Sequence, residues 1–262
     1  MKLVMTIVIY ALLFAAPTGA AKAQEKPHPA KAPEADATKA TTAEPTVDQI
    51  LDKYVQAIGG RQAIEKITSR VTKGAFEISS MGLKGELEAY AKAPNKLLTI
   101  RNFSGIGEIS DGYDGKVAWS QDPRTGLREK SGLELAAVAR TSDIHFPIKI
   151  RQLYSKLEFK GKEKVEKREA YVILATPAEG APMKMYFDTQ TGLISRTATE
   201  LETPQGQFHI ETTMDDYREV DGVKVVFTAR QESPMGSIVV KLTEAKHNVA
   251  IDDSKFNKPS GQ

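Results

Sequence analysis

The stretch that decides the fold is residues 183–202, MKMYFDTQTGLISRTATELE. In its first part, Met183, Met185 and Phe187 alternate with Lys, Tyr and Asp. Alternation with a period of two predicts a β-strand that buries one face. Residues 189–192, TQTG, then supply turn-forming side chains, and a second alternating run follows them. The stretch therefore predicts an antiparallel β-hairpin with one apolar face.

Similar runs continue on both sides of this hairpin. Val223, Val225 and Phe227 alternate with Lys and polar residues downstream, and Asp114-Gly115 is a strong two-residue turn signal upstream. Turn signals recur about every ten residues with short connections, which is typical of an antiparallel meander. We expect about ten or eleven strands between residues 70 and 247, in one large curved sheet.

Few helices accompany this predicted sheet. The first begins at Thr46, whose spacing from Gln49 is that of a capping box, and it ends at Gly59-Gly60. The remaining candidates are a short helix over residues 61–67, a helix over residues 132–140, and a loop or short helix from residue 146 through 152. One dominant sheet with a small helical part is an α+β fold.

The expected helices are too short to cover the apolar face of so wide a sheet. A sheet of this width must curl to remain a single layer. The shortage of helix suggests an open half-barrel whose concave apolar cavity lies under a partial helical lid. The alternative is a closed barrel or a sandwich whose inner faces pack against each other. Periodicity alone favours the packed core, since apolar faces are usually core.

The N-terminus predicts export. Residues 1–23 have a basic start, an apolar run over residues 3–16 and the small-residue cleavage motif Ala21-Lys22-Ala23. This is the pattern of a secretory signal peptide cleaved near Ala23. Residues 24–45 contain no aliphatic side chain larger than Ala and are expected to form a disordered tether. Residues 46–262 then form one domain, with no membrane span after signal removal.

Composition excludes several classes of protein. The chain has no Cys, which rules out disulfide scaffolds, thiolate metal sites and a Cys nucleophile, as well as an N-terminal lipid anchor on Cys. The net charge is +2 and the two signs alternate along the chain, which argues against nucleic acid as a partner. We expect a soluble periplasmic protein.

No catalytic or metal-binding motif is evident. The four His residues, His28, His145, His209 and His247, lack neighbours at metal-ligand spacing and are interpreted as isolated surface residues. No Ser or Thr lies in a nucleophile elbow, and the adjacent acidic pairs do not form a general acid and base pair. We therefore expect no metal, no cofactor and no enzymatic activity.

Several segments together resemble one family. They are ILDKYVQAIGG (residues 50–60), KAPNK (92–96), DGYDGKVAW (111–119), YFDTQTGL (186–193), DYREVDGVK (216–224) and the closing residues 252–259. The chain is similar to the outer-membrane lipoprotein carrier superfamily, the LolA/LolB-like proteins, in an exported bacterial branch. The resemblance implies an open half-barrel with a helical lid over a hydrophobic cavity, and so favours the cavity over the packed core.

If such a cavity is present, we expect apolar side chains of the strands and of the helix over residues 132–140 to line it. They are expected to be Phe76, Leu87, Leu98, Ile100, Trp119, Val138, Met185, Phe187, Phe208, Ile210 and Phe227. For the lid-closing arginine of the carriers, Arg101 is the candidate, and we interpret it instead as an ordinary surface arginine.

The resulting hypothesis is a periplasmic carrier that binds acyl chains of lipoproteins or lipids for transfer toward the outer membrane, with envelope transport proteins as further partners. The alternative hypothesis is a non-carrier module of the same fold that senses envelope state or bridges envelope proteins. A lipid hydrolase would need a nucleophile that the sequence does not show.

Overall fold

The computed structural model describes residues 44–203, 206–234 and 236–260. The predicted signal peptide, residues 1–23, lies outside the described residues, as does the predicted tether except for its last two positions.

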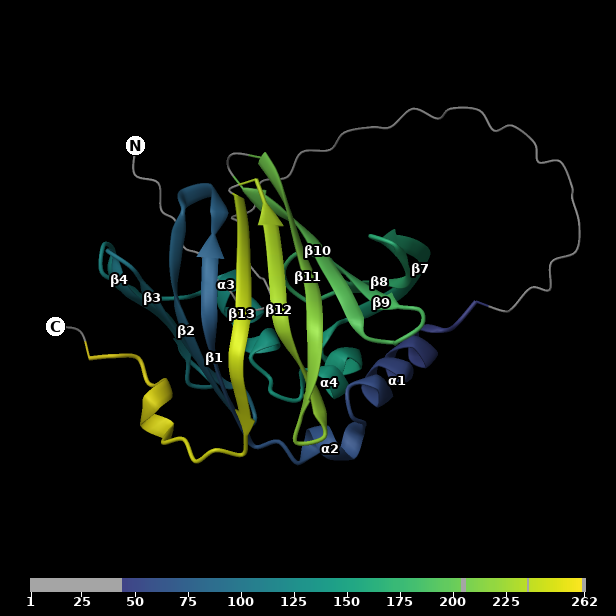
Figure 1. Ribbon diagram of the computed structural model, residues 1–262, viewed down its shortest axis with the longest axis horizontal. Coiled ribbons are helices and arrows are strands. Elements are labelled where there is room, and N and C mark those ends of the chain that lie inside the picture. The colour runs from purple at the N-terminus through teal and green to yellow at the C-terminus, as the bar shows by residue number, and fades with distance from the viewer. Residues whose placement is uncertain (1–43, 204–205, 235, 261–262) are drawn as a thin grey trace, which may run out of the picture.

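One antiparallel sheet dominates the described chain (Figure 1). Its thirteen strands lie in the order β6-β5-β4-β3-β2-β1-β13-β12-β11-β10-β9-β8-β7. They are β1 (Ser69–Ile78), β2 (Leu83–Lys92), β3 (Lys96–Phe103), β4 (Gly107–Tyr113), β5 (Ala118–Asp122), β6 (Gly126–Glu129), β7 (Lys156–Val165), β8 (Arg168–Thr176), β9 (Met183–Asp188), β10 (Ile194–Thr203), β11 (Gly206–Val220), β12 (Val223–Ser233) and β13 (Gly236–His247). The predicted α+β class and curved antiparallel sheet are confirmed.

The sheet consists of two meanders joined by one long-range pairing. The first strand, β1, pairs with the last strand, β13, so that Phe76 lies opposite Val240 and Ile78 opposite Ile238. Within the described residues, β6 and β7 are the two edges and do not pair with each other. The sheet is therefore an open half-barrel, and the closed-barrel and sandwich alternatives are wrong.

Four α-helices are present in the described chain, α1 (Val47–Ala57), α2 (Arg61–Glu65), α3 (Gly132–Thr141) and α4 (Phe146–Leu153), with two 3-10 helices, η1 (Ser79–Met81) and η2 (Asp253–Phe256). The predicted capping box forms: Gln49 N donates to Thr46 Oγ1 at 3.2 Å, and Thr46 N donates to Gln49 Oε1 at 2.9 Å. Two free backbone donors at the start of α1 are thereby satisfied.

The described sheet has thirteen strands, more than the ten or eleven expected, and the short helix forms where the sequence left a loop or a short helix open. Strand β6 was not predicted, because it is four residues long and mostly exposed and so has no buried alternating face to reveal it. Residues 146–153 form helix α4, with Pro147 in its first turn, where the missing N–H of proline costs nothing.

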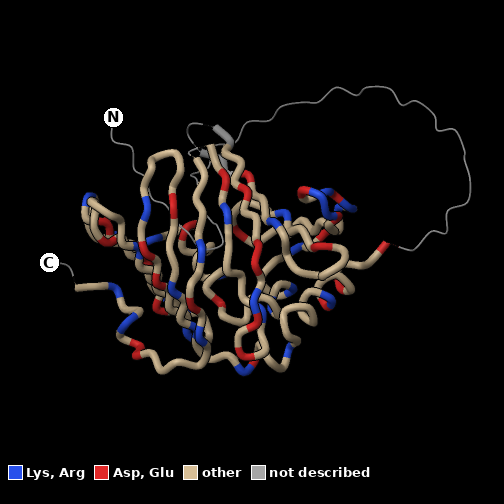
Figure 2. The backbone as a smooth tube through the Cα atoms, viewed as in Figure 1, with Lys and Arg blue, Asp and Glu red and all other residues tan. Residues whose placement is uncertain are grey.

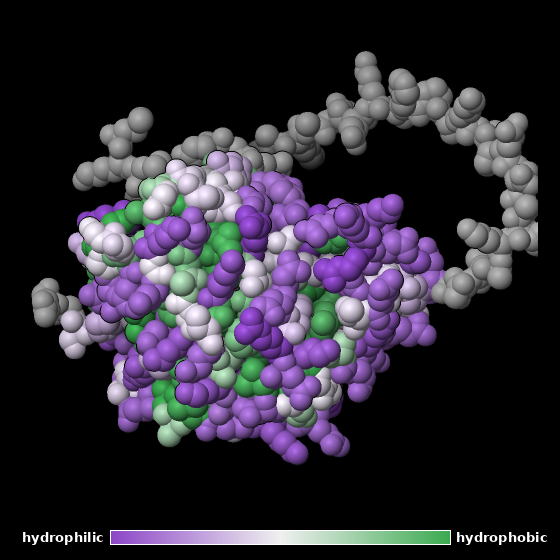
Figure 3. All heavy atoms as spheres, in the orientation of Figure 1, coloured by the Kyte–Doolittle hydropathy of each residue, from purple (hydrophilic) through white to green (hydrophobic). Residues whose placement is uncertain are grey.

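The two faces of the sheet are covered differently. Helices α1, α2 and α4 pack on the inner face, against β8, β9 and the starts of β10 and β12. On the outer face, η2 covers β3 and β5 by inserting Phe256 beside Trp119. Elsewhere the outer face, which faces the viewer, carries charges of both signs along its strands (Figure 2) and is mainly hydrophilic with scattered apolar residues (Figure 3). The main apolar surface of the sheet therefore points inward.

The end of α1 is held tightly against the β11–β12 turn. Gly59 has φ +128°, and a Cβ there would lie 2.1 Å from the carbonyl oxygen of Gly222. Beside this crossing, Lys224 N donates to the carbonyl of Ile58 at 2.8 Å. The crossing fixes α1 over the inner face.

We predict that Gly59→Ala lowers the free energy of unfolding by about 2–4 kcal/mol, because a Cβ adds both backbone strain and a clash with backbone. The control Gly82→Ala has φ +62° and open space around its Cβ, so it should cost only about 1 kcal/mol. Urea denaturation of both variants measures the difference. Equal costs would contradict the tight crossing.

Candidate functional site

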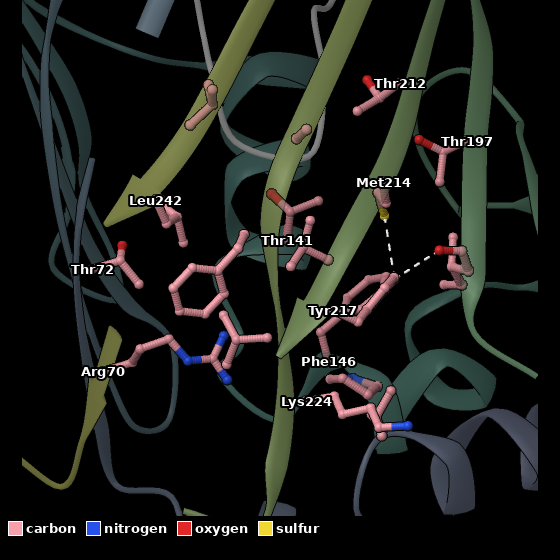
Figure 4. A pocket seen from close by; sticks show the side chains of 18 of the residues that line it. Arg70, Thr72, Thr141, Phe146, Thr197, Thr212, Met214, Tyr217, Lys224 and Leu242 are labelled. Atoms are coloured by element: carbon pink, nitrogen blue, oxygen red, sulfur yellow. Dashed lines mark hydrogen bonds between the residues drawn. The ribbon is translucent and has the colours of Figure 1, made fainter. Parts of the chain in front are cut away.

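A cavity of about 310 Å³ lies between the inner face of the sheet and the helices (Figure 4). Its sheet wall comes from β1, β2 and β9–β13, and its other wall from α1, α2 and residues 141–147. We call these three helical segments the helical cover. Pockets that bind small molecules in proteins have volumes of roughly 300–1,000 Å³ and are mostly apolar, so this cavity suits one modest apolar ligand.

The strand period builds the sheet wall. On β12 the lining includes every second position from Val223 to Gln231, together with Lys224 and Val226 near the start of the strand. The register places Val240 opposite Ala229 and Ile238 opposite Gln231, and both residues of β13 also line the cavity. Neighbouring strands therefore present aliphatic side chains to one continuous space.

Three of the residues expected from the sequence line this cavity: Leu87, Met185 and Phe227. Phe187 lies outside the lining because its ring packs against Tyr54 of α1, with centroids 5.5 Å apart. Phe76 lies on the inner face in a separate cluster with Phe103.

Two further expected residues lie on β11, beyond the cavity. Phe208 and Ile210 continue the same face of β11 as the lining residue Thr212, toward the β10–β11 turn.

Four expected residues have other surroundings. Leu98, Ile100 and Trp119 pack on the outer face, where Trp119 Nε1 donates to the carbonyl of Phe256 at 3.1 Å. Strand β3 is buried on both faces, so its apolar pattern could not show which face lines the cavity. Val138 is a half-buried residue of α3, outside the lining. Ligand contact by any of the expected residues stays a prediction.

The polar residues of the lining were not anticipated. Arg70 and Thr72 lie two positions apart on β1, and Tyr54 and Tyr217 face the same space from α1 and β11. The signal was present, because Arg70 and Thr72 share the alternating face that leads to Phe76.

Both phenols stay neutral. Tyr217 donates its hydroxyl to the carbonyl of Ile194 at 2.7 Å, and burial raises its pKa well above the usual value. Burial likewise raises the pKa of Tyr54, an effect that the charge of Arg70 partly offsets. These groups can donate hydrogen bonds but do not supply a base near neutral pH.

Arg70 is oriented by a buried histidine. Its Nε donates to Nε2 of His247 at 3.0 Å. Burial, with the nearby charge of Arg70, lowers the pKa of His247 to about 4, so the ring is neutral at pH 7 and can accept this bond. The interpretation of His247 as a surface residue is wrong: at the end of β13 its side chain is packed beneath β1 and the β11–β12 turn.

Arg101 is also buried, with only 1% of its surface exposed, so its interpretation as a surface arginine is wrong. It forms an ion pair with Asp111 of β4, and Lys130 approaches the other carboxylate oxygen at 2.7 Å. Burial alone would raise the pKa of Asp111, but the charges of Arg101 and Lys130 hold it below its usual value. The cluster pins β3, β4 and the chain after β6 together.

Comparison with known proteins defines the class of the fold. No protein-family model matches the chain, and no curated protein matches it by sequence. Among solved structures, a DUF1329 family protein from Desulfovibrio piger is similar with a TM-score of 0.58 and 17% identity, covering 80% of this chain and 97% of that one. An outer membrane lipoprotein-sorting protein domain from Vibrio parahaemolyticus is similar with a TM-score of 0.57 and 12% identity, covering 79% of this chain and 97% of that one.

A LolA superfamily protein from Nitrosomonas europaea gives a TM-score of 0.55 and 11% identity, covering 82% of this chain and 99% of that one. The class is thus a curved antiparallel half-barrel with short helices over its inner face. Within that class the chain has the fold of the LolA superfamily structures, as the sequence resemblance predicted. Among its described helices, none is long and apolar enough to cross a membrane.

We predict that the free energy of unfolding falls as the pH is lowered from about 6.5 to 4. In this window His247 binds a proton in the unfolded chain but stays neutral in the folded protein, because its pKa is about 4 when folded and the ordinary value is 6.5. The loss at pH 4 should be at most about 3 kcal/mol.

Urea denaturation across this pH range tests the prediction. His247→Gln should remove this part of the pH dependence, whereas His209→Gln, at an exposed position, should retain it. Parallel curves for the wild type and His247→Gln would contradict the assignment.

Proposed function

We propose that the protein is a periplasmic carrier that binds acyl chains of lipids or lipoproteins in the cavity and transfers them toward the outer membrane. The observation that carries the proposal is the apolar cavity between the inner face of the sheet and the helical cover. The likeness to LolA superfamily structures supports it at the level of the fold.

Burial of one acyl chain would give a reversible complex. At ~0.8 kcal/mol per buried CH₂, about ten buried methylenes contribute ~8 kcal/mol, which corresponds to a micromolar Kd before ordering costs. An acyl chain that leaves a membrane for this cavity exchanges one apolar surrounding for another, so the net free-energy change of the transfer is small. A small net change suits a carrier, which must both load and release.

The helical cover supplies a route for loading. Residues 141–147 reach the cavity from the end of α3 and the start of α4. In this connection, Ile144 N donates to the carbonyl of Pro94 in the β2–β3 turn at 3.2 Å, and His145 Nε2 lies 2.9 Å from the carbonyl of Ile67. Displacement of this connection would expose the cavity without breaking the sheet.

We predict that a large side chain at Ala229 blocks binding. In Ala229→Phe the ring occupies the middle of the cavity wall, so the variant should bind a fluorescent long-chain acyl probe at least about tenfold more weakly, a change of ~1.4 kcal/mol. Thr228→Phe is the matched control, because its side chain leaves the same strand on the opposite face. Fluorescence titration measures both. Equal affinities for the two variants would place the probe outside the cavity.

Transfer is tested separately from binding. With donor and acceptor vesicles separated by a membrane that only protein and monomeric lipid can pass, substoichiometric protein should accelerate movement of an acylated probe, and Ala229→Phe should not. Stoichiometric binding without acceleration would instead favour a sensing or bridging module of the same fold.

A further inference from the structure

One end of the cavity carries polar side chains, and a purely apolar ligand would form no hydrogen bonds with them. Arg70 and Thr72 project from the start of β1 toward this end, and Lys224 lies on the same side, near the start of β12 (Figure 4). None of the described residues that line the cavity is Asp or Glu. The Lys and Arg side chains of the described lining, Lys224 and Arg70, are both cationic.

Thr72 offers an unused hydrogen-bond donor at this end. Its residue is only 2% exposed, and its Oγ1 has no hydrogen-bond partner among the described residues. A buried hydroxyl without a partner is costly, and a ligand oxygen placed beside it would relieve that cost.

The Arg70 side chain is held in place two positions before Thr72 on the same strand. The bond from Arg70 Nε to the neutral ring of His247 fixes the side chain, which also lines the cavity. A guanidinium group binds carboxylate and phosphate oxygens by charge-assisted bonds.

The length of the cavity wall fits one chain with its head group. From Lys224 to Gln231, the lining of β12 extends about 23 Å at ~3.3 Å per residue. One leaflet of a bilayer, half of the ~30 Å hydrocarbon core, shows that an acyl chain extends about 15 Å. The difference leaves room for a head group at one end, and the apolar side chains of Ala229, Ile238 and Val240 then surround the far part of the chain.

We propose that the cavity selects single-chain amphiphiles with an acidic head group, a carboxylate or a phosphate, which binds at Arg70 and Thr72 while the acyl chain extends along β12. The proposal rests on the proposed function and names the ligand class of that site. Recognition of the acidic group orients the ligand and discriminates against neutral lipids of equal chain length.

Titration calorimetry with three probes of equal chain length tests this selectivity. Hexadecanoate and hexadecyl phosphate should each bind at least about tenfold more tightly than hexadecanol. Whichever acid binds more tightly identifies the head group. Hexadecanol binding as tightly as both acids would overturn the proposal and leave the proposed function intact, whereas binding of none of the three would overturn both.

Variants assign the selectivity to residues. Arg70→Met should remove the preference for acids without weakening the binding of hexadecanol, and Arg70→Lys should retain part of that preference.

Thr72→Val should weaken acid binding severalfold while leaving the stability of the protein unchanged or raised, because the Thr72 hydroxyl has no partner among the described residues. Thr212→Val is the matched control, since Thr212 is another buried lining threonine without a partner among the described residues, three strands away on β11. Equal effects of the two threonine variants, or an unchanged preference in Arg70→Met, would overturn the assignment.

Discussion

The structure depends on one constraint: the inner face of a thirteen-stranded sheet is larger than four short helices can cover. A closed barrel would bury that face against itself, but β6 and β7 remain the edges of the described sheet. Curvature and the helical cover bury most of the face, as the cluster beneath α1 and α4 shows. The surface left over becomes the cavity. Its apolar character thus follows from the same two-residue period that forms the strands.

The position of the cavity follows from where the helices are anchored. The crossing of Gly59 with Gly222 fixes the end of α1, and the ring contact between Tyr54 and Phe187 fixes its middle. On the outer face, η2 covers the apolar cluster at Trp119, a smaller buried cluster lies around Val172 and Tyr186, and charges of both signs occur along the strands. The C-terminal segment therefore covers part of the outer face, while the inner face keeps a space with cationic side chains at one end.

More of the fold than of the candidate site could be predicted from the sequence. Alternation and turn residues predicted the sheet, and the capping box at Thr46 and Gln49 formed as expected. Period alone cannot choose between faces where both are buried, so Leu98 and Trp119 were expected inside although they lie outside. The polar end of the cavity was not predicted, because the alternation of β1 places Arg70 and Thr72 on the face of Phe76 but does not show what lies beside them. Only the pairing of β1 with β13 brings them to His247 and into the cavity wall.

A carrier of the proposed kind holds an acyl chain in the space between β12 and the helical cover. A crystal structure with a fatty acid brominated near its chain end tests it most directly, because the bromine can be located by anomalous scattering. Bromine is expected beside Ala229 and Val240, with the carboxylate at Arg70. Bromine on the outer face near Phe256, or no bound bromine at saturating ligand, would contradict it.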